Sequence, residues 1–425
     1  MTGSFAGLDQ SFCGCDDSIA TVGPLIPVDV ALQRGLALAA AVEGVERLPL
    51  EQAVGRVLAG PAHARGPMPP FDNAAMDGYA LRLADLPGAG PWTLRVAGRI
   101  AAGDRGLATI PAGAALRIFT GAPVPEGCDA VVMQEAVTRI GGVITLTRAP
   151  EPGGNIRRAG EDLAEGAELL PAGRAIGARE AAALAAAGLG RVTVRRRLRV
   201  AIFSTGSELR EPGEALEPGQ IWNANRYHLR AALSQPWVDL ADLGALPDTP
   251  FRLRKVLEEA AARADLVIST GGVSVGEEDH MPHVFRAAGG ALQVMRLAMK
   301  PGKPLALGRL GGAVYIGLPG NPVSAFVSWM AIGARLAEAM AGLVAPPPRK
   351  TLVRAGFDLA RRAGRCEFAP ARICGYDGSG RQVIGMLSPS YAHRVALLAM
   401  ADGLALIPAE TERIAQGDLL EFMPF

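Results

Sequence analysis

The chain has 425 residues, 49% of them apolar and 20% charged, a composition typical of a globular protein with about three domains. Lys and Arg number 43 against 42 Asp and Glu, so the basic excess of a nucleic-acid-binding protein is missing overall. The five scattered cysteines exclude a disulfide framework. The longest uncharged apolar run, Pro322 to Ala334, is shorter than the roughly 20 residues of a membrane span. We therefore expect a cytoplasmic protein that binds neither nucleic acid nor membrane.

The first half of the chain predicts a loose start, two helices and a β-rich region. Residues 1–23 lack periodicity and lack the Lys and Arg of a secretory signal, which indicates a flexible extension. Apolar residues recur at helical spacing from Val28 to Val42. Short β-rich runs punctuated by Pro and Gly fill the region from Gly66 to Gly154. An Ala-rich helix over 178–187 is expected to end at Gly188.

Residues 198–342 alternate short β-branched runs with helical patterns, which predicts a parallel sheet covered on both faces. Thr249-Pro250 and Asn321-Pro322 have the pattern of a helix N-cap followed by an N1 proline. The expected strands are Leu198–Phe203, Val238–Leu243, Leu266–Ser269, Leu292–Leu297 and Val314–Ile316. A proline run at 346–348 then marks a linker, and 350–425 is expected to form a small β barrel or sandwich.

These patterns predict a multidomain protein of the α/β plus β class, with a parallel-sheet α/β domain, an inserted β-rich domain and a C-terminal β-barrel-like domain. The expected boundaries are a flexible extension over 1–23, a helical linker domain over 24–65 and 158–193, a β-rich domain over 66–157, an α/β domain over 194–345 and a C-terminal β domain over 346–425.

Polar residues of the α/β region cluster in the loops that follow its strands. Loops at the carboxyl ends of parallel strands share one edge of the sheet, and that edge is where such sheets bind ligands. Glycine-rich backbone offers N–H groups to an anion, lysines add positive charge, and carboxylates suit Mg²⁺. The residues concerned are Gly271, Gly272, Gly276, Lys300, Lys303, Glu208, Asp248 and Asp279.

One such loop alone would be an ordinary turn with solvated acids, but five loops on one edge favour a site for a phosphate ester or an oxyanion. No Walker A pattern is present, and no Gly-x-Gly-x-x-Gly follows a strand, so ordinary ATPases and nicotinamide dehydrogenases are disfavoured. For two segments of the β-rich region, the sequence does not decide between a structural and a functional role. Asn73 and Asp77 suit either turn formation or function, and Arg157-Arg158 suits either a surface loop or phosphate capture.

Six motifs taken together resemble those of the molybdopterin molybdenumtransferases, and the E domain of gephyrin is similar. They occur in chain order from about Val28 to Pro348, and a weaker likeness extends to Phe425. The motifs are Asp72-Asn73-Ala74-Ala75-Met76-Asp77-Gly78-Tyr79-Ala80, Thr120-Gly121-Ala122-Pro123-Val124-Pro125, Asn155-Ile156-Arg157-Arg158 with Gly160-Glu161-Asp162, Ser269-Thr270-Gly271-Gly272-Val273-Ser274-Val275-Gly276, Lys300-Pro301-Gly302-Lys303-Pro304, and Leu318-Pro319-Gly320-Asn321-Pro322-Val323-Ser324.

The resemblance implies a homodimeric transferase that inserts molybdate into adenylyl-molybdopterin and releases AMP, with Mg²⁺ as the metal ion. Contacts with the adenylylating enzyme or with downstream cofactor-processing proteins are also expected. Catalytic roles are expected for Asp77, Thr120, Asp162, Asp279, Lys300 and Lys303. Substrate binding is expected at Gly271, Gly272, Ser274, Gly276, Pro319, Pro322, Arg372 and Ser390, and metal binding at Glu208 and Asp248.

The sequence departs from this family pattern at three positions. Ser207 and Asn223 stand where many relatives carry Asp, and each change removes either a metal ligand or only a hydrogen bond. Pro370 stands where relatives often have Arg, in the segment that provides Arg372. Two other functions compete with the transferase: a non-enzymatic scaffold and an enzyme that adenylylates molybdopterin. Retention of the acidic and lysine positions argues against the scaffold, and the motifs before the α/β region argue against the adenylylating enzyme.

Overall fold

The computed structural model describes residues 24–104, 109–273, 280–344, 350–388 and 390–425. The predicted extension 1–23, the proline linker and the site residues Ser274, Gly276 and Asp279 lie outside these ranges. The chain divides into two compact units, one made of Met1–Gly44 with Arg195–Phe425 and the other of Val45–Val194. Among the described helices, none has the length and apolar character needed to cross a membrane.

A six-stranded sheet with the order β16-β13-β17-β21-β20-β18 forms the centre of the first unit. The first four of these strands are parallel, whereas β20 runs antiparallel to both neighbours, β21 and β18. The sheet is therefore mixed rather than wholly parallel, and β18 has the same direction as β21. The bounds are β13 Leu198–Thr205, β16 Val238–Leu246, β17 Leu266–Thr270, β18 Ala291–Arg296, β20 Pro304–Leu310 and β21 Ala313–Leu318.

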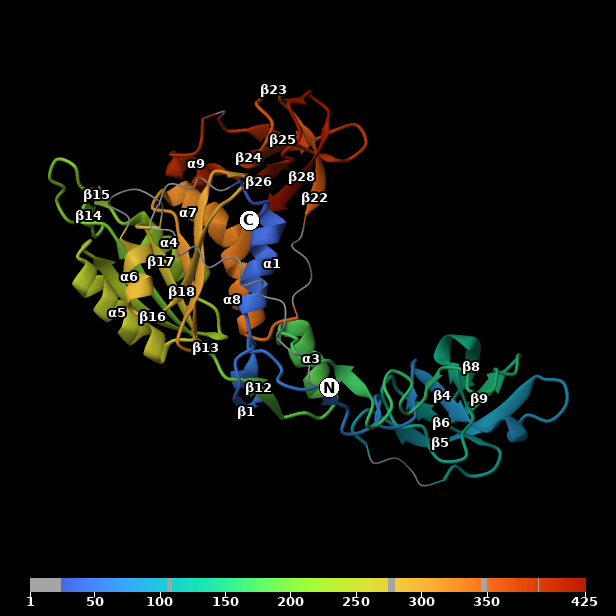
Figure 1. The fold of residues 1–425 in the computed structure, drawn as a ribbon. Helices are drawn as coiled ribbons and strands as arrows, with labels where there is room; N and C mark the ends of the chain where they lie inside the picture. Colours follow the sequence, from blue (N-terminus) through green and yellow to red (C-terminus); the bar gives the residue numbers. More distant parts are fainter. Residues whose placement is uncertain (1–23, 105–108, 274–279, 345–349, 389) are drawn as a thin grey trace. The chain divides into compact units, whose positions relative to one another are not determined.

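Helices cover both faces of this sheet, as predicted, and Figure 1 shows the two layers. One face packs against α1 (Val28–Leu38), α4 (Ala224–Ala232), α7 (Pro322–Ser328) and α8 (Ala334–Met340). The other face packs against α5 (Pro250–Arg263) and α6 (Met281–Ala287). Because Ala31 of α1 belongs to the core of this sheet, segment 24–44 packs here and not with the predicted linker domain.

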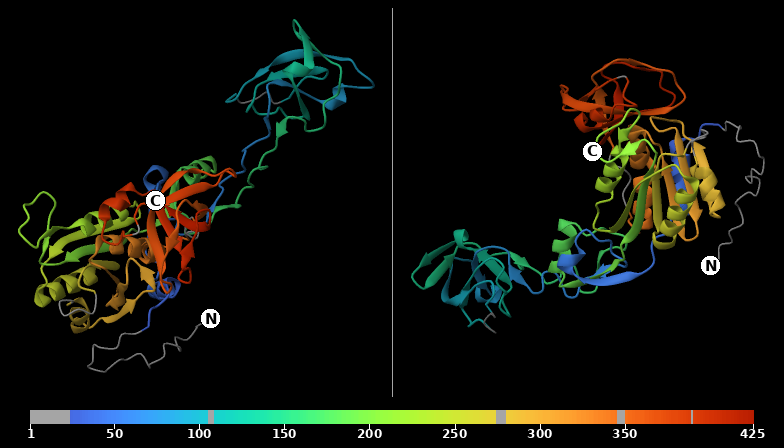
Figure 2. Two further views of the ribbon diagram at one scale, coloured as in Figure 1. Left: turned by 90° about the horizontal axis from the view of Figure 1, so that it is seen from above. Right: turned by 90° about the vertical axis from the view of Figure 1, so that its left-hand side faces the viewer.

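The C-terminal part of the first unit is a closed barrel, whose strands Figure 2 shows in two views. The order β24-β25-β22-β28-β26 returns to β24, and the short strand β19 (Met299–Lys300) adds to the outside of β24. The other bounds are β22 Thr351–Ala355, β24 Cys366–Tyr376, β25 Gln382–Met386, β26 Gly403–Ile407 and β28 Leu419–Pro424, with α9 over Val395–Met400. Alternating apolar residues of these strands fill the interior, as the β-barrel prediction requires.

The second unit contains a six-stranded sheet with the order β7-β4-β6-β5-β9-β8 and a smaller core around α3 (Ala178–Ala186). Gly188 has a φ of +78°, so the predicted glycine cap ends this helix. The sheet strands are β4 Gly78–Leu81, β5 Trp92–Ile100, β6 Ala114–Ile118, β7 Ala130–Met133, β8 Val137–Ile140 and β9 Val143–Leu146, and the smaller core also contains β1 Val45–Pro49 and β12 Arg191–Arg195.

Asp265 ties together the amino-terminal edge of the α/β sheet. Its carboxylate accepts hydrogen bonds from the Arg196 guanidinium at 2.7 and 3.0 Å and from the Arg199 backbone N–H at 2.9 Å. Burial by itself would raise the pKa of Asp265, but the hydrogen bonds from Arg196 and Arg199 outweigh it and hold the pKa far below its usual range.

We expect Asp265→Asn to lower the free energy of unfolding at pH 7 by about 2 kcal/mol, because charge-assisted hydrogen bonds to two arginines are lost. A carboxylate with a depressed folded-state pKa stabilises the protein above its unfolded-state pKa, and this contribution is lost as the pH falls toward the folded-state value. The difference between the two proteins should therefore be full above about pH 4 and shrink below it. Urea unfolding at pH 7 and pH 3 measures both quantities.

Asp239→Asn provides the control, because Asp239 is an exposed carboxylate on the neighbouring strand β16 whose charge also acts on Arg199. Exposed pairs contribute little, so this change should cost less than about 0.5 kcal/mol. A difference between wild type and Asp265→Asn that stays constant from pH 7 to pH 3 would contradict the assigned role of the charge.

Candidate functional site

A cavity of about 510 Å³ opens at the carboxyl edge of the α/β sheet. The loops that follow β13, β16, β17 and β21 all contribute to its wall, because these four strands are parallel and end at the same edge. Six residues predicted from the sequence line this one cavity: Glu208, Asp248, Gly271, Gly272, Pro319 and Pro322. The structure thus brings together residues that lie up to 114 positions apart in the chain.

The base of the cavity is built from Gly271 and Gly272, which have φ values of +88° and +62°. A Cβ atom on Gly271 would lie 2.5 Å from the Thr205 carbonyl oxygen, and one on Gly272 would lie 3.0 Å from Thr205 Oγ1. Both the conformation and the close approach therefore require glycine. Thr205 is 5% exposed, and its hydroxyl has no hydrogen-bond partner among the described residues. Thr205 was missed by the sequence analysis, although its place at the end of a buried strand is a usable signal.

Two carboxylates, Glu208 and Asp248, stand on the wall of the same cavity. Ser207 holds the second of them, since its backbone N–H donates to Asp248 Oδ2 at 3.0 Å and its hydroxyl accepts from the Asp248 N–H at 3.4 Å. Within the described ranges, no group of three or more His, Cys, Asp and Glu side chains is placed to hold a metal ion. Two carboxylates nevertheless fit Mg²⁺, which proteins usually bind through one or two carboxylates together with substrate phosphates.

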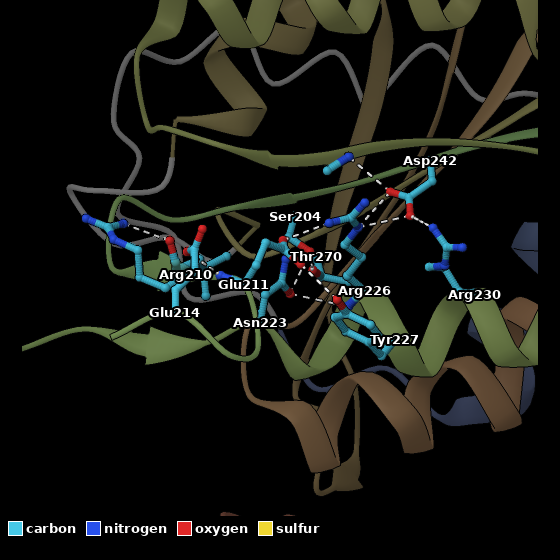
Figure 3. A network of polar contacts seen from close by, with 12 residues as sticks. Ser204, Arg210, Glu211, Glu214, Asn223, Arg226, Tyr227, Arg230, Asp242 and Thr270 are labelled. Atoms are coloured by element: carbon cyan, nitrogen blue, oxygen red, sulfur yellow. Dashed lines mark hydrogen bonds and ion pairs between the residues drawn. The ribbon is translucent and has the colours of Figure 1, made fainter. Parts of the chain in front are cut away.

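Asn223 belongs to a network of polar contacts that includes the cavity residue Thr270, shown in Figure 3. Its side-chain oxygen accepts from Ser204 Oγ at 3.1 Å and from the Arg226 N–H at 3.3 Å, so it caps α4 at its first turn. Thr270 Oγ1 in turn donates to Ser204 Oγ at 3.0 Å. Asn223 is 1% exposed and faces the fold, which favours the hydrogen-bonding alternative over a metal ligand at this position.

The rest of the network fixes the start of α4 electrostatically. Arg226 Nε donates to both carboxylate oxygens of Asp242, at 3.0 and 2.9 Å, and Arg230 contacts the same carboxylate. Burial alone would raise the pKa of Asp242, but the hydrogen bonds from Arg230, Gly244 and Arg226 lower it. Asp242 therefore stays ionised and serves the fold rather than a ligand.

Two asparagines support the loop after β21. Asn321 accepts from the Ser324 N–H at 3.0 Å and so caps α7, with Pro322 at the first helical position, as predicted. Asn225 donates to the Gly320 carbonyl at 2.8 Å and lines the cavity. Pro250 likewise begins α5, but the Thr249 side chain before it makes no capping hydrogen bond.

The two predicted lysines lie on the loop after β18, at the same edge of the sheet. Lys303 is exposed to solvent, and the next residue, Pro304, lines the cavity. The loop is closed by a hydrogen bond of 2.6 Å from the Leu297 N–H to the Lys303 carbonyl. Lys300 Nζ does not enter the cavity wall but lies 3.2 Å from Glu367 Oε1 on the C-terminal barrel.

Two predicted residues of the C-terminal barrel, Arg372 and Ser390, make contacts within the barrel. Arg372 is exposed and donates to the Met400 carbonyl at 3.4 Å, and Ser390 is exposed and hydrogen-bonds with Ser388. In the described parts of the chain, no hydrogen bond or ion pair joins Arg372 or Ser390 to Lys300. The contacts of Lys300 are instead made by Glu367 and Tyr391, which the sequence analysis did not single out.

In the second unit the structure brings Asp77 and Thr120 together. Asp77 Oδ1 accepts from the Thr120 backbone N–H at 2.9 Å and from its hydroxyl at 2.8 Å, and these hydrogen bonds lower the pKa of Asp77. Asp77 sits before Gly78, where a Cβ atom would lie 1.9 Å from the Val132 carbonyl oxygen, so only glycine allows this strand pairing. Asp77 thus lies in the bend before β4, and its carboxylate is held in one orientation by Thr120.

The other predicted positions of this unit are on different loops. Asp162 is exposed in a bend, and its backbone N–H donates to the Met68 carbonyl at 2.9 Å. Arg158 is paired with Asp72 at 2.6 Å, and both side chains remain partly exposed. The Ala159 N–H, burial and Arg158 act on Asp72 with the net effect of lowering its pKa. Arg158 thus already has an anionic partner within its own unit.

The topology, the glycine-lined cavity and its two carboxylates describe a multidomain protein with a candidate ligand site at the carboxyl edge of its α/β sheet. Three family models match the chain in order: the MoeA N-terminal region (domain I and II) over residues 26–188, a probable molybdopterin binding domain over 201–338 and the MoeA C-terminal region (domain IV) over 352–425. The chain belongs to the molybdopterin molybdenumtransferase family. The predictions of this family and of a transferase are confirmed.

Named relatives support the assignment over nearly the whole chain. A molybdopterin molybdenumtransferase of Haemophilus influenzae is 36% identical over 383 residues, which cover 89% of this chain and 94% of the relative. Molybdopterin molybdenumtransferase 2 of Mycobacterium tuberculosis is 38% identical over 387 residues, covering 88% and 93%. The solved structure of a molybdopterin biosynthesis moeA protein from Pyrococcus horikoshii OT3 is similar with a TM-score of 0.81 at 29% identity, covering 94% of this chain and 100% of that one.

We expect Gly271→Ala to lower the free energy of unfolding by about 2 kcal/mol, because a side chain at positive φ is strained and this one also meets the Thr205 carbonyl. Gly320→Ala is the matched control in the same cavity, since its Cβ would meet Gly271 Cα at an ordinary 3.6 Å. Thermal or urea unfolding of both variants gives the comparison. A Gly271→Ala protein as stable as Gly320→Ala would show that the cavity base is not built as described.

Proposed function

We propose that this protein inserts molybdate into adenylyl-molybdopterin and releases AMP, the last common step of molybdenum cofactor biosynthesis. Family membership supports the proposal, and one structural observation carries it further. Six residues expected to bind the substrate or the metal ion, from four separate loops, line a single cavity at the sheet edge. Adenylyl-molybdopterin contains a phosphoanhydride, and the glycines and flanking carboxylates of the cavity suit such a group together with Mg²⁺.

Each part of the cavity has a distinct task in this proposal. The lack of side chains at Gly271 and Gly272 leaves room for the phosphates, although the Gly271 N–H already donates to the Leu318 carbonyl at 3.1 Å. Glu208 and Asp248 would hold Mg²⁺, which would supply positive charge near the anhydride. Lys300 and Lys303 bring positive charge for the oxyanion. Ser274, Gly276 and Asp279 follow Gly271 and Gly272 in the sequence. They keep the substrate-binding and catalytic roles expected from the family resemblance.

Catalytic roles are also proposed for Asp77, Thr120 and Asp162 of the second unit. A carboxylate held by two hydrogen bonds, like that of Asp77, has a defined orientation and remains ionised at neutral pH. Substrate-binding roles for Pro319 and Pro322 are supported by their place on the cavity wall. The roles of Arg372 and Ser390 rest on the family resemblance alone.

The proposal includes a homodimer, a cytoplasmic location, and contacts with the adenylylating enzyme or with downstream cofactor-processing proteins. Within the described residues Cys128, Cys366 and Cys374 are free thiols, which is the usual state in a reducing compartment. Burial raises the pKa of Cys128 and of Cys366 to about 11, so these two thiols remain protonated and inert.

Lys303→Ala should reduce molybdate-dependent AMP release by about 100-fold, because an exposed cation next to the cavity is removed from the developing negative charge. The assay contains pure protein, adenylyl-molybdopterin, Mg²⁺ and molybdate, and it follows AMP. Lys255→Ala is the control, since Lys255 is an exposed lysine on α5 that does not line the cavity, and it should retain wild-type rates. Wild-type protein that releases no AMP under these conditions would refute the proposed function.

Mixing two inactive variants tests the homodimer. Asp77→Ala changes one unit of the chain and Glu208→Ala the other. If each catalytic centre of a dimer uses residues from both subunits, about a quarter of the wild-type activity should return after complete subunit exchange, because half of the dimers contain one intact centre. Subunit exchange is monitored with differently tagged chains. Exchange without recovered activity would contradict shared centres.

A further inference from the structure

Lys300 is held between the α/β sheet and the C-terminal barrel by backbone pairing. The short strand β19 pairs in parallel with the start of β24, so that Lys300 lies opposite Glu367 in the register. The Cys366 N–H donates to the Ala298 carbonyl at 2.8 Å and continues this pairing. The lysine-bearing loop is therefore an edge strand of the barrel sheet, although its chain comes from the α/β domain.

Glu367 occupies the centre of a buried polar cluster. It is only 5% exposed, and both of its carboxylate oxygens are engaged. Oε1 lies 3.2 Å from Lys300 Nζ and 3.1 Å from Arg361 Nε, and Oε2 accepts from the Tyr391 hydroxyl at 3.0 Å. Burial and the Glu367 charge raise the pKa of Tyr391 far above its usual range, so the hydroxyl remains a donor. The Tyr391 ring also lies 5.5 Å from Lys300 Nζ, within range of a cation–π contact.

The two cations of this cluster, Arg361 and Lys300, differ in how many of their N–H donors remain for a ligand. The other Arg361 nitrogens donate to backbone carbonyls, those of Pro408 at 2.8 Å, Thr411 at 2.7 Å and Arg365, and its side chain is 5% exposed. Lys300 is 33% exposed, and its ammonium has three N–H donors, of which the Glu367 ion pair uses one. The positive charge still available to a ligand therefore belongs to Lys300.

We propose that Glu367, itself fixed by Arg361 and Tyr391, is a positioning residue that holds the Lys300 ammonium ready for the oxyanion substrate. This inference rests on the proposed function, because it takes Lys300 as a group that meets molybdate. A lysine side chain has many rotamers, and a partly exposed one is not oriented unless something anchors it. An ammonium held in place before the anion arrives stabilises negative charge without reorganising during the reaction. In this way the C-terminal barrel acts on the substrate through Lys300.

A double-mutant cycle between Glu367→Gln and Lys300→Ala tests the inference in the full-length protein. Glu367→Gln keeps the shape of the side chain and removes its charge. We expect it to lower kcat/KM for molybdate by about 10-fold, with the KM for adenylyl-molybdopterin unchanged. In the Lys300→Ala background the same change should have almost no further effect, because Glu367 acts through Lys300.

Calorimetric titration with molybdate alone provides a second readout that does not depend on turnover. The affinity for molybdate should fall in both single variants.

Two further variants separate positioning from a structural role. Glu421→Gln removes the carboxylate of another Lys–Glu pair on the same barrel, the exposed Lys350–Glu421 contact of 2.6 Å, and should leave all parameters at wild-type values. Tyr391→Phe removes only the hydrogen bond to Glu367 Oε2, leaves the charges in place, and should lower kcat/KM for molybdate by a smaller factor of about 3. It replaces Glu367→Gln in the cycle if the latter fails to fold.

Three outcomes would overturn the inference. Equal losses from Glu367→Gln with and without Lys300 would show that the carboxylate only supports the fold. Tighter molybdate binding by Glu367→Gln would show that Glu367 competes with the anion for Lys300. Absence of molybdate binding by the wild-type protein in the titration would show that molybdate is not a ligand of Lys300. By contrast, wild-type protein that binds molybdate but releases no AMP would refute the proposed function and leave the positioning by Glu367 standing on the binding data.

Discussion

Parallel hydrogen bonding among β16, β13, β17 and β21 is the constraint on which the candidate site depends. Because these strands run in one direction, the loops that follow them must emerge at the same edge, and the cavity forms between those loops. The reversed strand β20 does not break this arrangement. It allows β18 to resume the parallel direction, so the loop with both lysines also returns to that edge. The opposite edge has a structural task, since Asp265 joins two arginines there.

Polar side chains around the cavity divide into those used by the fold and those left for a ligand. Asn321 caps α7 and Asp242 anchors two arginines, so their hydrogen-bonding capacity is largely consumed. Asn223 caps α4 through its side-chain oxygen, and its side-chain nitrogen has no partner among the described residues. Glu208 and Asp248 face the cavity, and the Thr205 hydroxyl lacks a partner among the described residues. A buried polar group without a partner is costly, which makes such groups better indicators of a ligand than satisfied ones.

The loop from Met299 to Pro304 belongs to two structures at once. It begins as an added strand of the C-terminal barrel and ends as the first residue of a strand in the α/β sheet. Apolar residues of the barrel also join the core on one face of that sheet, among them Phe368 and Leu404. The position of Lys300 is therefore set by two folded regions together, and a change in the packing between them would move its ammonium.

The sequence by itself determined most of the local structure and the family. Apolar periodicity and turn residues predicted the main strands and helices of the α/β region, because those patterns depend on neighbours a few residues away. Strand direction then predicted that Glu208, Asp248, Gly271 and Gly272 would meet, as they do. Domain boundaries were harder to predict, since α1 packs in a core formed from residues more than 150 positions later.

Only the tertiary structure decided which polar side chains face the cavity and what each one contacts. Asn223 and Asp248 are both polar residues in the sequence, yet the first is buried and caps α4 whereas the second lines the cavity. Glu367 lies 67 positions from Lys300, and no local pattern predicts that pairing. It depends on the register of β19 against β24, which is set by how two separately folded regions pack. Contacts of this kind are determined by the global arrangement of the chain, because their energy arises between residues that no sequence spacing connects.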